Sequence, residues 1–197
     1  MANQPGLEQK SGLEQRSGLL QSAWFLPLSA SAVWWLVRLA LIGRIPFETG
    51  IIVGSLLHFG LMIAMVFVHD IQSNRGLDFI QGFKSNLRPA VLLACFGAAS
   101  VGFLHHGVTA EATSLRKLER ERFIEQSLSS DEAFAVIQES DPQLAYMDRE
   151  TARQRALDGL RFQFEPMWHV TASLLALLAA ALSTTLFVTF VGRVLRA

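Results

Sequence analysis

Four long apolar stretches constrain the fold of this chain more than any other feature. A helix needs about 20 mostly apolar residues to cross the roughly 30 Å hydrocarbon core of a bilayer. The stretches that reach this length are residues 23–42, 49–68, 89–108 and 167–191. They do not alternate apolar and polar residues, as the strands of a membrane barrel do. We therefore predict an all-α integral membrane bundle of four transmembrane helices.

The first stretch has to be distinguished from a signal peptide, because Ser29 to Ala32 is a run of small residues. The apolar run before it, from Trp24 to Leu28, is too short for a signal-peptide core, and no basic segment directly precedes it. Apolar sequence also continues beyond the small residues. We expect an uncleaved span.

The overall charge limits the classes of partner. The 197 residues are 51% hydrophobic and 17% charged, and 17 Lys and Arg residues balance 17 Asp and Glu residues. Nucleic-acid binders carry a basic face, so a neutral chain argues against that class. With one cysteine, Cys95, the chain forms no intramolecular disulfide and no zinc site built on several cysteines. The expected partners are the lipid bilayer and other membrane-protein subunits or copies of the chain itself.

The N-terminal 22 residues contain an imperfect hexapeptide repeat, Gly6 to Ser11 and then Gly12 to Ser17. A leucine every six residues matches neither the helical nor the strand period, and recurrent Gly and Ser are typical of flexible segments. We predict a flexible tail over residues 1–22 and one transmembrane domain over residues 23–197.

The segment between spans three and four, residues 109–166, is expected to form an extramembrane helical loop. Residues 112–128 are rich in Glu, Arg and Leu, which favour helix. Ser129 and Glu132 have the spacing of a capping box, and Asp141 before a proline predicts a further helix start. The apolar face that then leads into the fourth span comprises Leu157, Leu160 and Phe164. We expect a small helical cap over one end of the bundle.

Basic residues predict the orientation. With four spans, both termini share one side with the 69–88 loop, and that side carries seven basic and four acidic residues. The 109–166 loop carries eight basic and twelve acidic residues. The positive-inside rule therefore places both termini in the cytoplasm and the 109–166 loop outside.

Small residues recur every fourth position in two spans, where they predict close helix contacts. In the third span they are Ala94, Ala98 and Gly102, and in the fourth Ala172, Ala176, Ala180 and Thr184. The second span has Gly50 and Gly54. We interpret these stripes as packing surfaces.

Two ionisable residues inside the spans are candidates for function, because charges and histidines in a membrane are costly. Arg38 lies about one turn from the end of the first stretch, where a long side chain can snorkel to the interface. His58 is in the middle of the second stretch. A packed, hydrogen-bonded histidine and a proton relay are both open interpretations of His58.

A second group of candidates lies at the outer boundary. His105 and His106 end the third stretch, while Glu165 and His169 lie four residues apart at the start of the fourth, on one helix face. Imidazoles and a carboxylate suit zinc or another divalent transition metal. The alternative is that these histidines are interfacial anchors and that the chain has no cofactor.

The sequence from Gly76 to Lys84, Gly-Leu-Asp-Phe-Ile-Gln-Gly-Phe-Lys, precedes the third stretch. With the long loop and the short basic C-terminal tail, it resembles a bacterial family of small four-span membrane proteins classed as a domain of unknown function. The resemblance implies the four-span topology and no activity. We expect the chain in the bacterial inner (plasma) membrane.

Three functions remain open. A non-catalytic accessory or scaffold subunit fits the small-residue stripes and the lack of a catalytic motif. A small oligomeric transporter or channel would use Arg38 and His58, and a metal-dependent membrane enzyme would use the outer histidines.

Overall fold

The computed structural model describes residues 6–74, 76–140, 144 and 146–195, and within them the chain is helical without a strand. The helices are α1 (Gly6–Leu41), α2 (Phe47–Ser73), α3 (Phe79–Phe103), the π-helical turn η1 (Leu104–Val108), α4 (Ala110–Ser127), α5 (Asp131–Ser140), α6 (Arg149–Gln163) and α7 (Pro166–Val194). They form two compact units. Unit 1 comprises Met1–Ala98 with Leu174–Ala197, and unit 2 comprises Ala99–Ser173.

Four helical segments are long and apolar enough to cross a membrane, namely Trp24–Leu41, Phe47–Ser73, Phe79–Val108 and Pro166–Val194. Many of their large apolar side chains point outward, including Leu36, Leu56 and Phe187, which are 69%, 67% and 64% exposed. Such an apolar exterior is costly in water and suits hydrocarbon. The predicted all-α membrane bundle with four spans is confirmed, and the chain is a multi-pass membrane protein.

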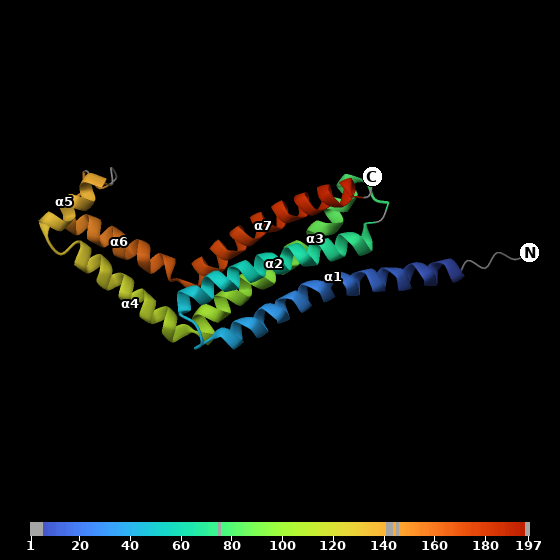
Figure 1. Cartoon of the computed structure of the whole chain (residues 1–197), viewed down its shortest axis with the longest axis horizontal. Coiled ribbons are helices and arrows are strands. Elements are labelled where there is room, and N and C mark those ends of the chain that lie inside the picture. The colour runs from blue at the N-terminus through green and yellow to red at the C-terminus, as the bar shows by residue number, and fades with distance from the viewer. Residues whose placement is uncertain (1–5, 75, 141–143, 145, 196–197) are drawn as a thin grey trace, which may run out of the picture. The chain divides into compact units, whose positions relative to one another are not determined.

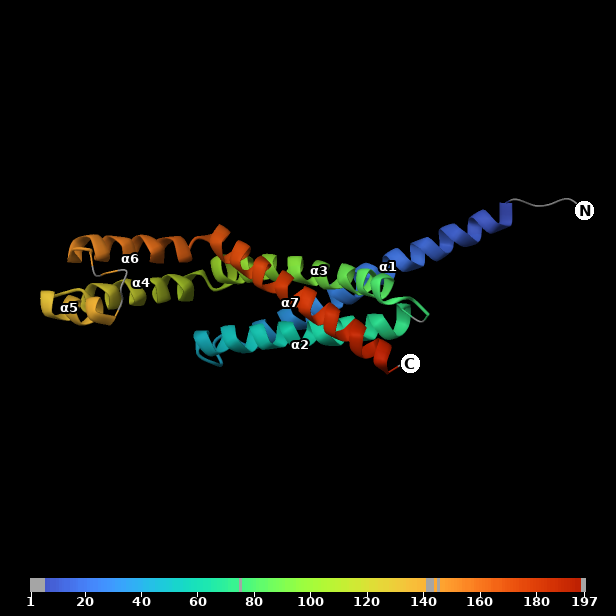
Figure 2. The same cartoon turned by 90° about the horizontal axis from the view of Figure 1, so that it is seen from above.

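Unit 1 is held together by a core of small and flexible apolar side chains. The fully buried members include Met62 and Val66 of α2, Ala90 and Leu93 of α3, and Ala181 of α7. The α7 helix crosses α2 and α3 obliquely (Figure 2). Alanines at the crossing let the helix backbones approach closely, which is how helices associate in lipid.

The predicted 69–88 loop is wrong in extent, because most of it is helix. The α2 helix continues to Ser73, and α3 already begins at Phe79. The Asp78 carboxylate accepts a hydrogen bond from the Gln81 amide at 2.8 Å and so caps the first turn of α3. The short connection turns at Gly76, whose φ of 82° favours glycine.

Helix α1 also starts earlier than the apolar pattern indicates. It begins at Gly6 and so includes the hexapeptide repeat, where we predicted a tail without regular structure. The residues between the repeated glycines and serines are Leu, Glu, Gln, Lys and Arg, all good helix formers. Local propensity therefore accounts for the helix even though the six-residue period creates no apolar stripe.

In unit 2, α4 and α6 lie side by side and α5 joins them at the end where α4 ends and α6 begins (Figure 1). A small apolar core forms between them from Leu128, Phe134 and Ala152. Helix α5 is capped by Ser130, whose hydroxyl accepts from the Ala133 amide at 3.2 Å, one residue after the predicted cap Ser129. The predicted start at Asp141 lies outside the described residues.

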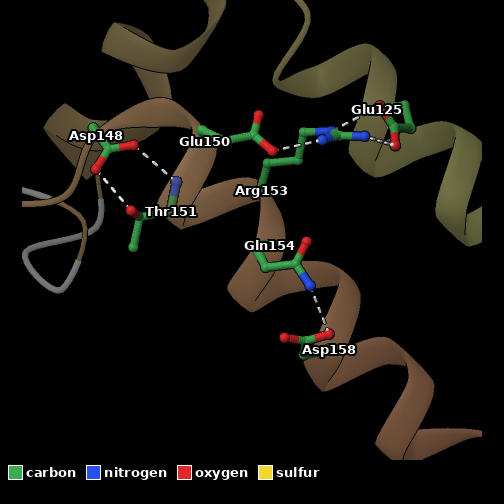
Figure 3. A network of polar contacts seen from close by, with 7 residues as sticks. All are labelled: Glu125, Asp148, Glu150, Thr151, Arg153, Gln154 and Asp158. Carbon is green, nitrogen blue, oxygen red and sulfur yellow. Dashed lines mark hydrogen bonds and ion pairs between the residues drawn. The ribbon is translucent and has the colours of Figure 1, made fainter.

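Polar contacts fix α6 against α4 (Figure 3). Arg153 of α6 pairs with Glu125 of α4 at 2.7 Å and with Glu150 of its own helix at 2.8 Å. The hydrogen bonds from Arg153 hold the pKa of Glu125 below its ordinary value of 4.5. Asp148 caps α6 by accepting from the amide and hydroxyl of Thr151, which lowers the pKa of Asp148.

The small-residue stripes are only partly buried. Ala94 and Ala98 of α3 are 0% and 2% exposed, as expected for a contact surface. On α7 the stripe is divided: Ala176 is exposed, whereas Ala180 packs against the core and Thr184 is buried beside Ala181. The predicted face of α7 is therefore a contact surface only in its C-terminal part.

Candidate functional site

Arg38 lies in the last turn of α1 and is buried against α2, with 4% of its surface exposed. Its Nη1 donates a hydrogen bond to the backbone oxygen of Gly50. A Cβ atom at Gly50 or Gly54 would come within 2.8 Å of the Arg38 side chain. The two glycines thus let the guanidinium lie directly on the α2 backbone near the start of that helix, and the snorkelling interpretation of Arg38 stays a prediction.

Trp34 connects Arg38 to His58. The Trp34 Nε1 donates to the backbone oxygen of Gly54 at 2.8 Å, and its ring centroid lies 5.9 Å from Cζ of Arg38. The His58 ring meets Trp34 edge-on, with 6.2 Å between centroids. On its other side His58 packs against Gly97 of α3, where a Cβ would lie 2.6 Å from Nε2 of His58. The two intramembrane candidates therefore belong to one buried row.

The sequence did not single out Trp34, although its spacing contained a signal. Trp34 and Arg38 are four residues apart, as are Gly50, Gly54 and His58 in turn. Four-residue spacing places side chains on one helix face. The two glycines leave one face of α2 without bulk, and the large side chains of Trp34 and Arg38 share one face of α1. A face of small residues and a face of large residues can pack closely against each other. Two atoms in the row, Nε of Arg38 and Nε2 of His58, are buried without a hydrogen-bond partner among the described residues.

A second polar cluster links α2, α3 and α7 within unit 1. Asp70 Oδ1 accepts hydrogen bonds from the side-chain amides of Asn74 and Asn86, at 2.9 and 2.8 Å. The Asn74 amide also donates to Asn86 Oδ1 at 2.8 Å, and the Asn86 amide to Thr189 Oγ1 at 3.0 Å. All four side chains are at most 3% exposed.

This cluster is positioned by the helical ends that the sequence assigned to a loop. Beside it, His69 Nε2 lies 3.2 Å from Ser85 Oγ. In a low-dielectric interior such bonds are strong, and an unpaired polar group is costly. Because each amide donates to two or more acceptors, the cluster works chemically as a clamp that holds three helices in one register.

The three histidines predicted at one boundary of the spans gather in unit 2. His105 and His106 lie in η1, a π-helical turn, and His169 lies in the first turn of α7. Ring centroids of His105 and His106 are 5.1 and 4.9 Å from that of His169. His106 Nε2 and His169 Nδ1 are 2.7 Å apart, a hydrogen-bond distance. The π-helical turn, a feature often found at functional sites, brings both adjacent imidazoles to the same neighbour.

The fourth predicted ligand does not join this cluster. Glu165 is exposed, and its carboxylate forms no hydrogen bond or ion pair with another described residue. No group of three or more His, Cys, Asp or Glu side chains in the described part of the chain is placed to hold a metal ion. One nitrogen of the His106–His169 pair carries the shared proton, whereas a metal needs a lone pair from each ring. The arrangement therefore suits a hydrogen-bonded imidazole pair.

The chain matches no protein-family model, no curated protein and no solved structure at a significant level. The resemblance seen at Gly76 to Lys84 stays a prediction. Function has to be inferred from the geometry of the chain alone.

Proposed function

We propose that this chain is a non-catalytic accessory or scaffold subunit of a bacterial inner membrane, with both termini in the cytoplasm and α4–α6 outside. Its buried polar clusters support this role because their groups mainly satisfy one another. Asp70, Asn74 and Asn86 hydrogen-bond to one another, with Asn74 Oδ1 left without a partner among the described residues, and Arg38 is anchored to a backbone carbonyl. Such clusters position helices.

The observation that carries the proposal is an apolar face on α4. Leu115 and Leu118 are 55% and 41% exposed, three residues apart on one face of an otherwise strongly charged helix. Helix α4 lies outside the candidate spans. Exposed apolar surface of this kind is typical of a protein-binding face.

A second surface within the spans supports the same role. Gly60 and Ala64 are exposed four residues apart on α2, and a Cβ at Gly60 would meet nothing within 4 Å. Small residues on an outward face let a partner helix approach closely in lipid. A partner subunit could thus contact the chain both in the bilayer and through α4.

Site-specific photo-crosslinking in intact cells tests this proposal. A photoreactive residue at Leu118 should give a discrete adduct with another membrane protein, and the same residue at exposed Asp158 on α6 should not. Gly60→Leu should reduce recovery of that adduct's partner in mild detergent. If Leu118 gives no adduct, and the purified chain is a monomer without partners, the scaffold role is wrong.

A small transporter or channel is the second candidate. It is favoured by the row of Arg38, Trp34 and His58, because an arginine and a histidine buried in a span mark many ion and proton paths. Proteoliposome flux that is lost in both Arg38→Gln and His58→Gln variants would support it. Flux indistinguishable from that of empty vesicles would remove it.

A further inference from the structure

A cavity of about 990 Å³ lies within unit 2, among α4, α5, α6 and the first turn of α7. Its volume is at the upper end of the range for small-molecule sites, roughly 300–1,000 Å³. Most of its wall is apolar and includes Ile124, Leu128, Ile137, Leu160, Phe164 and Trp168. On α6, a Cβ at Gly159 would meet nothing within 4 Å, so the helix backbone borders open space there.

The charges that line this cavity have one sign. Arg116 and Arg120 of α4 and Arg155 of α6 contribute to the wall, with His169 beside them and no acidic side chain among the lining residues. Arg120 and Arg155 form no ion pair with another described residue. The composition does not predict a cavity lined by basic side chains alone, because the 109–166 segment has twelve acidic and only eight basic residues.

Acidic side chains of α4 and α6 instead pair with arginines that do not line the cavity. Glu125 and Glu150 pair with Arg153, as Figure 3 shows, and Asp158 pairs with Arg161 at 3.4 Å. Arg153 and Arg155 are two residues apart, which places them about 200° apart around the helix. Helix α6 therefore pairs Arg153 with carboxylates, whereas Arg155, whose Nη1 lies 3.8 Å from Sδ of Met147, lines an acid-free, largely apolar cavity.

We propose that this cavity binds a single-chain anionic lipid, with its carboxylate or phosphate headgroup at Arg120 and Arg155 and its acyl chain along the apolar wall. The planar guanidinium matches both headgroups through paired charge-assisted hydrogen bonds. A soluble anion would gain nothing from the apolar wall, and a neutral lipid nothing from the arginines. Trp168 and His169 belong to the first turn of a candidate span, so the cavity adjoins a segment suited to lipid.

Quenching of Trp168 fluorescence by a brominated acyl chain tests the site. The full-length protein in nanodiscs of zwitterionic lipid is titrated with 12-bromododecanoate, and Trp168→Phe identifies the signal that comes from the cavity. We expect saturable quenching that is absent from Trp168→Phe. The uncharged analogue 12-bromododecanol should bind about tenfold more weakly, because it lacks charge-assisted hydrogen bonds to arginine.

Matched variants separate binding in the cavity from partitioning into the bilayer. Arg120→Gln and Arg155→Gln should each weaken binding about tenfold. Arg122→Gln and Arg161→Gln remove the same charge from exposed positions of the same helices and should leave affinity unchanged. Gly159→Leu fills the open space with a better helix former, so it should abolish binding while unit 2 stays folded.

Two results would overturn the proposal. Equal quenching by the acid and the alcohol would show that the arginines do not select a headgroup. Unchanged quenching in Gly159→Leu would show partitioning of the probe only. Neither result bears on the adduct expected at Leu118, which does not line the cavity, so this site and the scaffold role can fail independently.

Discussion

Replacing Gly97 with alanine should destabilise unit 1 through a collision with His58. The new Cβ would lie 2.6 Å from Nε2 of His58 and 2.8 Å from Cδ1 of Leu177. The leucine methyl can rotate away, but the imidazole is held between Gly97 and the Trp34 ring. Overpacking of this kind costs about 1–3 kcal/mol.

Gly60→Ala on α2 is the matched control, because a Cβ there meets nothing within 4 Å. Both substitutions gain about the same helix propensity, roughly 1 kcal/mol. The difference between the two variants therefore isolates the collision, about 1–3 kcal/mol. For a chain of this size each kcal/mol corresponds to roughly 2–4 °C in Tm. Thermal unfolding of the purified chain in detergent measures this difference.

A double-mutant cycle then identifies His58 as the cause. In a His58→Ala background the space beside Gly97 opens, so Gly97→Ala should become neutral or mildly stabilising. The coupling free energy should be about 1–3 kcal/mol. If Gly97→Ala and Gly60→Ala shift Tm equally, or if the cost persists without the imidazole, the reasoning about this row is refuted.

Three further predictions concern the other clusters. Asn86→Leu should lower Tm in detergent, since each polar partner left unsatisfied in the bundle costs about 1–3 kcal/mol; an unchanged Tm would mean the cluster is not a clamp. Gly50→Ala should also lower Tm, and Arg38→Met should relieve that loss by removing the guanidinium that the new Cβ meets; equal losses in both backgrounds would contradict the contact. The lowered pKa values of Glu125 and Asp148 mean that these carboxylates stabilise unit 2 fully above about pH 4.5 and less as pH falls through the folded-state pKa values. The protection of α4 and α6 amides against hydrogen exchange, measured relative to the intrinsic exchange rate, should therefore fall when the pH is lowered from 5 to about 3. Protection that does not fall would refute the linkage.

The spans could be predicted from the sequence because length and hydropathy together specify a bilayer-crossing helix. The polar ends of these helices could not. Residues 69–88 carry Asp70, Asn74 and Asn86, which read as loop residues when taken singly. In the fold Asn86 of α3 pairs with both Asp70 and Asn74 at the end of α2, and such tertiary pairing leaves no periodic signal along the chain.

The candidate sites, like the helices, could be predicted from the sequence only in part. The approach of His105 and His106 to His169 followed from topology, since one helix ends where the next span begins. The cavity did not, because it depends on which face of α4 and α6 each arginine occupies. Only the α4–α6 pairing reveals that Arg153 meets carboxylates while Arg155 lines an acid-free cavity.

Cysteine accessibility in intact cells tests the four-span topology most directly. In a Cys95→Ala background, single cysteines replace Ser11, Leu77 in the turn between α2 and α3, and Glu119 on α4. An impermeant maleimide should label only the Glu119 position, because both termini and the α2–α3 turn are proposed to be cytoplasmic. Labelling of Leu77 and Glu119 together would contradict the account, because α3 would then not cross the membrane, and labelling of Ser11 and Leu77 alone would invert its orientation.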